Sequence, residues 1–93
     1  MFEELEYEYN LFLEDMKNDK TFCRYMDEEE YEDDYSHNEI GECQRKLTEM
    51  IEEYLRKNKP NRYVVLGDWC IFVMTVDEAK KRNIWHYENY IVK

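Results

Sequence analysis

The chain has very few of the residues that interrupt regular structure. Of its 93 residues only two are glycine and one is proline. This scarcity leaves little room for long loops, so most of the chain is expected to form helix or strand. Hydrophobic residues make up 43% of the sequence, which is too much for a disordered chain and enough for a small core. These values predict one domain spanning residues 1–93.

Long apolar runs and secretion signals are also missing. The longest apolar run, residues 69–74, is far too short to cross a bilayer. The first residues have neither the basic start nor the apolar centre of a signal peptide. The three cysteines are an odd number without Cys-x-x-Cys spacing. We therefore expect reduced thiols in a soluble protein of the cytoplasm, which would be the host cytoplasm if a phage encodes it.

No enzyme motif is present either. Two histidines and three scattered cysteines define no nucleophile with its base, and there is no glycine-rich phosphate loop. Zinc sites need closely spaced ligand pairs, and an EF-hand loop needs a glycine that the acidic stretch lacks. We expect no catalytic residue, no cofactor and no specific metal site. Only a Cys–His or metal constellation assembled by the fold would favour an enzyme.

What the chain does have is acidic charge, unevenly placed. The formal net charge is −10. Residues 1–53 hold nineteen acids and five bases, whereas residues 54–93 hold four acids and eight bases. An acidic half does not favour nucleic acid as a ligand, because phosphate binding needs Lys and Arg. It favours basic protein surfaces. We divide the domain into an acidic helical half, 1–58, and a β-rich half, 61–93.

Two stretches have the spacing of amphipathic helices. Apolar residues recur every three or four positions over 2–17 and again over 40–57, the latter preceded by a capping box from Ser36 to Glu39. Tyr7 and Leu11 fall on the opposite side of the first helix. They are either scattered surface residues or a contact patch, and the pattern leaves both open. Three acids of the second helix precede a base by four residues and are compensated locally: Glu42–Lys46, Glu52–Arg56 and Glu53–Lys57.

The remaining segments predict a sheet. Residues 63–66 and 69–76 read as a hairpin with a type II′ turn at Gly67-Asp68, and the second strand, apolar on both faces, should be central. Residues 77–82 suggest a short helical turn, residues 84–92 a third strand, and residues 22–26 a short turn of helix. The predicted class is α+β. Two amphipathic helices are followed by a three-stranded antiparallel sheet with a short helical turn between its last two strands.

The most distinctive stretch is residues 27–34, where seven of eight side chains are carboxylates. No Lys or Arg occurs between Arg24 and Arg45, so these acids lack local compensation. They could pair internally with the basic cluster of residues 80–82. Alternatively, rows of carboxylates could imitate the phosphates of a nucleic acid and fill a groove lined by Lys and Arg, with Tyr31 and Tyr35 as hot-spot aromatics.

In size and charge the chain resembles the small acidic inhibitors that phages use against host defence nucleases, including many anti-CRISPR proteins. The resemblance is one of composition, so it assigns no residue a role. We expect an inhibitor that binds a basic nucleic-acid-binding surface, with an immunity or antitoxin protein and a dimeric adaptor module as alternatives. The predicted contact residues are Asp27, Glu28, Glu29, Glu30, Tyr31, Glu32, Asp33, Asp34 and Tyr35, with Glu3, Glu4, Tyr7 and Glu14.

Overall fold

The computed structural model describes residues 3–24, 37–67 and 70–93, apart from the side chains of residues 3, 4 and 37–40. Within these residues it is an α+β fold with a three-stranded antiparallel sheet, as predicted. The elements are α1 (Glu3–Lys17), β1 (Phe22–Arg24), α3 (His37–Asn58), β2 (Tyr63–Gly67), β3 (Ile71–Thr75), α4 (Val76–Lys81) and the 3-10 helix η1 (Tyr87–Tyr90).

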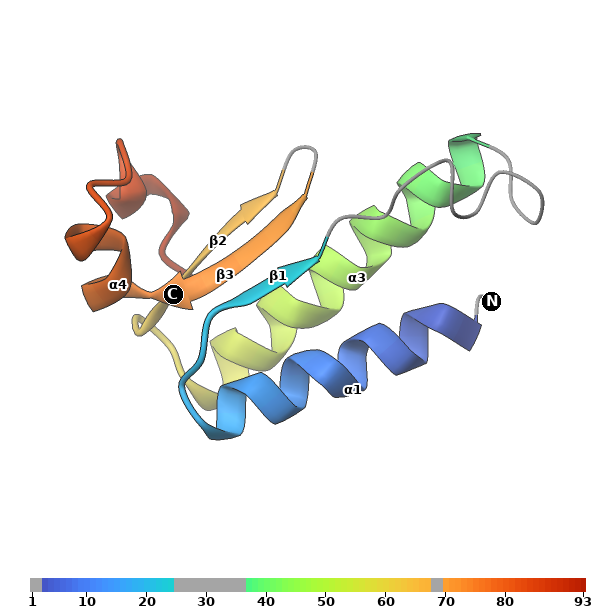
Figure 1. Ribbon diagram of the computed structural model, residues 1–93, viewed down its shortest axis with the longest axis horizontal. Helices are drawn as coiled ribbons and strands as arrows, with labels where there is room; N and C mark the ends of the chain where they lie inside the picture. Colours follow the sequence, from blue (N-terminus) through green and yellow to red (C-terminus); the bar gives the residue numbers. More distant parts are fainter. Residues whose placement is uncertain (1–2, 25–36, 68–69) are drawn as a thin grey trace.

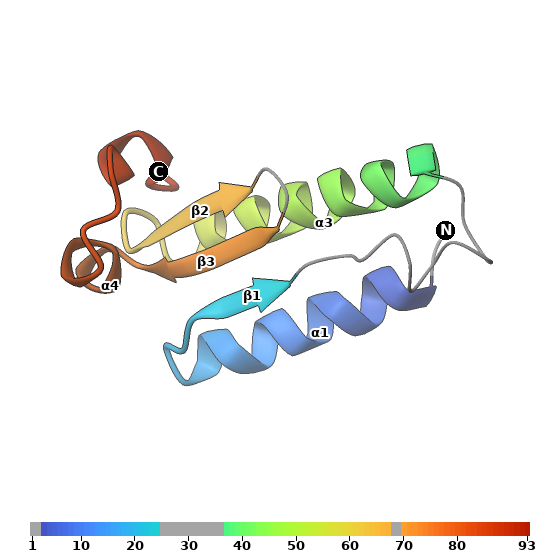
Figure 2. The same ribbon diagram turned by 45° about the horizontal axis from the view of Figure 1, so that its top comes forward.

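The two long helices follow the predicted apolar stripes. Leu5, Phe12 and Met16 of α1 are buried, and so are Cys43, Leu47, Ile51 and Leu55 of α3. Both helices begin at the same end of the molecule and run in the same direction (Figures 1 and 2). The predicted N-cap, Ser36, lies outside the described residues. The sequence placed the end of α3 near Lys57, and the helix ends at Asn58.

The predicted position of the central strand is confirmed, because the strand order is β1-β3-β2. The identity of the third strand was wrong. It is β1, from the acidic half, and not residues 84–92. The short helical turn predicted around Phe22 is therefore wrong as well. Phe22 turns inward against Phe12, with ring centroids 5.6 Å apart, while Cys23 pairs with Phe72 across the ladder.

Residues 84–92 do not form a strand, although they are rich in β-prone side chains. Asn83 and His86 have positive φ angles of 56° and 57°, which turn the chain and interrupt an extended run. The 3-10 helix η1 follows. An isolated antiparallel bridge between Val64 and Ile91 is what links this segment to the sheet ladder. The predicted helical turn after β3 is present as α4, with Thr75 as its N-cap.

The hairpin between β2 and β3 is confirmed, but its predicted turn is wrong. Gly67 pairs with Ile71 and belongs to the strand, so the connection is residues 68–70. A type II′ turn would need a positive φ at Gly67, which the structure does not show. Residues 68 and 69 lie outside the described residues.

The sheet has two unlike faces. Tyr63, Val65, Ile71 and Val73 point toward α1 and α3 and belong to the main core. On the other face Val64 and Met74 pack with Ala79 of α4 and with partly buried residues of the C-terminal segment, including Ile84, Tyr87 and Ile91. This second face is thus covered by α4 and the C-terminal segment of the same chain.

Candidate partner-binding surface

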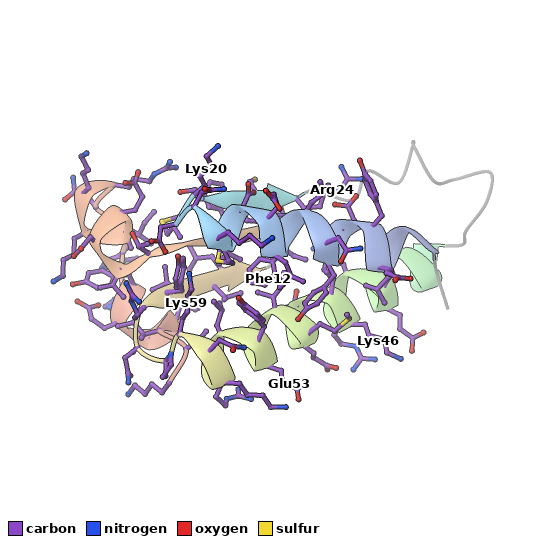
Figure 3. The ribbon with its side chains drawn as sticks, turned by 90° about the horizontal axis from the view of Figure 1, so that it is seen from below. Phe12, Lys20, Arg24, Lys46, Glu53 and Lys59 are labelled. Atoms are coloured by element: carbon purple, nitrogen blue, oxygen red, sulfur yellow. The ribbon has the colours of Figure 1, made fainter. Side chains whose placement is uncertain are left out.

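A groove runs between the flank of α1 and the strand β1, which lie side by side (Figure 3). It has a volume of about 530 Å³. Helix α1 forms one wall and the edge strand of the sheet forms the other. The lining residues are Tyr7, Glu8, Leu11, Glu14 and Asp15 of α1, and Phe22, Cys23 and Arg24 of β1.

The floor of the groove is held by an ion pair. The Arg24 Nε lies 2.8 Å from Glu8 Oε1, and the Glu8 residue is only 4% exposed. Beside it, Phe22 is buried against Phe12 of α1. The strand is therefore fixed to the helix by one charged and one apolar contact. Breaking a buried ion pair by removing one partner is costly, so this contact sets the spacing between the two walls.

The helical wall is apolar and exposed. Tyr7 is 63% exposed and Leu11 is 42% exposed, as the sequence predicted for the side opposite the core. The structure adds that both side chains border a groove with a strand on its far side. Two exposed apolar side chains beside an edge strand favour a contact patch over a scattering of surface residues.

Acidic side chains extend this wall. Glu14 lies 3.7 Å from Lys17, but both side chains are about two-thirds exposed or more, so the pair contributes little to stability. Asp15 lines the groove one residue further on. Glu3 and Glu4 occupy the first turn of the same helix, with side chains outside the described part.

Of the predicted contact residues, the structure brings Tyr7 and Glu14 together in this groove. Those of 27–35 lie outside the described residues, as does any pairing with the basic residues 80–82. The sequence prediction missed β1 as a groove wall. Its three residues are too few to show the period-two alternation of a strand, so no sequence signal distinguished it from a turn of helix.

The turn that leads into β1 is anchored to the rest of the fold. The Tyr63 hydroxyl donates a hydrogen bond to Asp19, and the Lys59 ammonium lies 3.3 Å from the same carboxylate and 2.6 Å from the Met16 carbonyl oxygen. These hydrogen bonds lower the pKa of Asp19 below its usual range. Burial, followed by the bond to Asp19, raises the pKa of Tyr63. The turn before the strand is thereby tied to α1, to the segment that follows α3 and to β2.

The three cysteine thiols differ in their burial. Cys43 is buried in the core, whereas Cys70 is only partly buried and Cys23 is exposed. Cys23 and Cys70 are close enough to hydrogen-bond, and burial together with this neighbour raises the pKa of Cys23. Among the described residues no group of three or more His, Cys, Asp or Glu is placed to hold a metal ion.

A second hollow, of about 470 Å³, lies on the outer face of the sheet. Its lining includes Leu66, Phe72, Met74 and Ile84, and the Arg82 guanidinium stands 5.6 Å from the centre of the Phe72 ring. Arg82 also donates from Nε to Glu78 Oε1 at 2.8 Å, which lowers the pKa of Glu78. None of the described residues that line this hollow is acidic, so these residues do not favour a basic partner.

Comparison with protein-family models, curated proteins and solved structures found no match to this chain. Within the described ranges, no helix has both the length and the apolar character needed to traverse a bilayer. The candidate surface is therefore defined by its own chemistry: an apolar and acidic helical wall, a strand edge, and a strongly acidic sequence directly after that strand.

Proposed function

We propose that this protein is a non-enzymatic inhibitor that binds the basic nucleic-acid-binding surface of another protein by imitating nucleic acid. The target class is a nuclease or other nucleic-acid-handling protein, and the site of action is the cytoplasm, in a host cell if a phage encodes the chain. The contact residues are the carboxylates of 27–34 with Tyr31 and Tyr35, joined by Glu3, Glu4, Tyr7 and Glu14.

The supporting observation is the placement of charge along the molecule. The two long helices begin at the same end, and the stretch that joins β1 to α3 carries seven carboxylates in residues 27–34. The opposite end holds the last turns of α1 and α3 and the helix α4, with Lys17, Lys57 and the basic residues 80–82 (Figure 1). The basic last turns of α1, α3 and α4 thus lie away from the N-termini of the two long helices, and the densest run of acids is in the sequence that joins β1 to α3.

The spacing of carboxylates on such a chain suits a phosphate-binding groove. Phosphates along one strand recur about every 3.4 Å of axis rise, and helical side chains four residues apart stand about 5–6 Å apart. A row of Glu and Asp can therefore meet several Lys and Arg side chains of a groove that normally holds nucleic acid. Opposite charges steer the two proteins together, and salt weakens that attraction.

The test is a charge reversal in the acidic run. Glu28, Glu29, Glu30 and Glu32 are replaced together by Lys, and capture of nucleic-acid-handling proteins from a host lysate is compared at low and high salt. The matched control replaces Glu42, Glu49, Glu52 and Glu53 of α3, which changes the net charge equally. We expect the first variant to lose at least about tenfold in affinity and the control far less. Equal binding of the target by the first variant and the natural protein would contradict the mimicry proposal.

Two alternatives use the same surface differently. An immunity or antitoxin protein would cap a basic toxin, and the identity of the captured partner separates it from an inhibitor of a nucleic-acid enzyme. A dimeric adaptor module is favoured by the exposed pair Tyr7 and Leu11 and by the outer edge of β1, with which no strand in the described part of the chain pairs. Sedimentation at micromolar concentration decides this case, because a strict monomer removes it.

A further inference from the structure

The most informative feature of the groove is that one of its walls is the edge of a sheet. The strand order is β1-β3-β2, and within the described residues no strand pairs with the outer side of β1. In an antiparallel ladder alternate residues direct their N–H and C=O groups toward the same neighbour. A three-residue edge strand therefore directs the backbone groups of at least one residue away from the sheet, into the region beside the groove.

The opposite wall, formed by α1, would contact the side chains of a bound segment and not its backbone. Tyr7 and Leu11 are exposed apolar groups on α1, and Glu14 and Asp15 continue the same flank. A segment lying along β1 would alternate its side chains between the two faces of the extended sheet. Those on the helical side would meet an apolar surface followed by carboxylates, which suits an apolar residue and a Lys or Arg two positions away.

From this arrangement we propose that the partner protein supplies an extended basic segment that adds to β1 as a further antiparallel or parallel strand, with its side chains seated against the flank of α1. The proposal rests on the proposed function, since it specifies how the basic partner is held. Adding a strand to an exposed sheet edge is a general mode of peptide recognition, in which backbone hydrogen bonds contribute affinity and side-chain positions contribute specificity.

The charge of the groove selects this occupant over a second copy of the chain. The lining of the groove includes three acids, Glu8, Glu14 and Asp15, and one base, Arg24, so two such surfaces brought edge to edge would repel each other. A basic segment gains from the same charges. The ion pair between Glu8 and Arg24 closes the floor, which leaves Glu14 and Asp15 as the carboxylates of the helical wall that face an incoming cation.

The experiment uses a synthetic peptide of alternating Lys and Val residues as the probe and the full chain labelled with ¹⁵N. We expect amide shift changes centred on residues 22–24 and slower hydrogen exchange at the outward-facing amide of β1. The control peptide has the same sequence and charge but carries N-methyl groups on alternate residues, which prevents pairing along one edge. It should bind at least about tenfold more weakly. Equal binding of the two peptides, or shifts centred on β2, would overturn strand addition.

A variant of the helical wall tests the side-chain part of the proposal. Leu11→Lys places a cation beside the incoming basic segment and should weaken peptide binding at least about tenfold. Trp85→Lys is the matched control, because Trp85 is 83% exposed and is not among the residues that line the groove, and it should change binding by less than about twofold. Self-association through residues 22–24 in the absence of peptide would overturn the proposal in favour of a second copy.

Failure of this inference can be told apart from failure of the proposed function. If the peptide does not add to β1 while charge reversal of residues 28–32 still abolishes target binding, strand addition is wrong and mimicry stands. If the peptide adds to β1 while that charge reversal leaves target binding unchanged, strand addition stands and mimicry is wrong.

Discussion

The two edges of the sheet differ in how they are covered. The β2 edge is covered by the end of the chain: Val64 bridges to Ile91, the Val92 amide donates to the Tyr63 carbonyl at 3.0 Å, and the Asn61 amide donates to the Val92 carbonyl at 2.7 Å. The β1 edge pairs with no described strand and borders a groove. Natural sheets protect their edges against unwanted pairing, so an edge left open beside an acidic wall indicates a place for contact.

The comparison also shows how each edge is kept in place. At β2 the cover is backbone pairing and the burial of Val92, which is 7% exposed. At β1 the strand is held from beneath, by the Glu8–Arg24 pair and by Phe22 against Phe12. One edge is closed by hydrogen bonds to its backbone. The other is anchored by side chains, and no strand of the described residues pairs with its outer side. Different substitutions should therefore weaken the backbone hydrogen bonds at the β2 edge and the side-chain contacts at the β1 edge.

The largest effect is expected from opening the β2 edge. A chain ending at Tyr90 loses the backbone pairing and the buried Val92 side chain, which should cost about 4 kcal/mol of unfolding free energy. The exposed strand should also make the protein associate with itself. Urea unfolding and sedimentation velocity measure the two effects. A truncated chain that stays monomeric and fully stable would show that the C-terminal segment does not protect this edge.

The next effect is expected at the floor of the groove. Arg24→Met leaves the Glu8 carboxylate buried without its cation and should cost about 3 kcal/mol, read from urea unfolding. The double variant Glu8→Leu/Arg24→Met removes both charges and should recover most of that loss. If the double variant is as unstable as the single one, packing of the Arg24 side chain matters more than the buried charge.

A smaller effect, dependent on pH, is expected at the turn before β1. The pKa of Asp19 is lowered by its bonds to Tyr63 and Lys59, so it stabilises the fold at neutral pH and above the usual pKa of an aspartate. That stabilisation is lost as pH falls through the lowered pKa of the folded state. The difference in stability between the natural chain and Asp19→Asn should therefore be constant near pH 7 and shrink below about pH 4. A difference that does not change on acidification would contradict the assigned bond.

The smallest effect is expected away from both edges. Lys57 lies 2.9 Å from Glu53 on the exposed face of α3, where solvent screens such a pair and it contributes little to stability. Lys57→Ala should therefore leave the unfolding temperature nearly unchanged in low salt and change it even less in high salt. Thermal unfolding at two salt concentrations measures this. A loss of stability as large as that expected for Arg24→Met would contradict the prediction that an exposed ion pair contributes less than the buried Glu8–Arg24 pair.

Most of the fold follows from patterns that the sequence displays over many residues. The stripes of α1 and α3 extend over several turns, and the continuous apolar run of β3 indicates a central strand. The errors fell on short segments. Residues 22–24 carry too few positions for a period, and residues 84–92 look like a strand until the positive φ angles of Asn83 and His86 turn the chain. Such local angles depend on tertiary packing.

The candidate surface was predictable only in part. Tyr7 and Glu14 could be placed on the outer side of a helix, because helical spacing alone fixes that. The groove could not be predicted, since its second wall comes from a strand that sequence patterns did not reveal. The i,i+4 pairing was partly right as well: Glu53 meets Lys57, while Glu42 lies 3.6 Å from Arg45 instead of meeting Lys46.

The parallel course of α1 and α3 has a further consequence. Aligned peptide dipoles give each helix a partial positive charge at its N-terminus, and here two such ends lie at the same end of the molecule. Acids in the first turns, Glu3, Glu4 and Glu6 in α1 and Glu39 in α3, stand at positions where negative charge complements these dipoles. Part of the acidity at this end therefore stabilises the first turns of the two helices, so neutralising it would weaken those turns even without a partner.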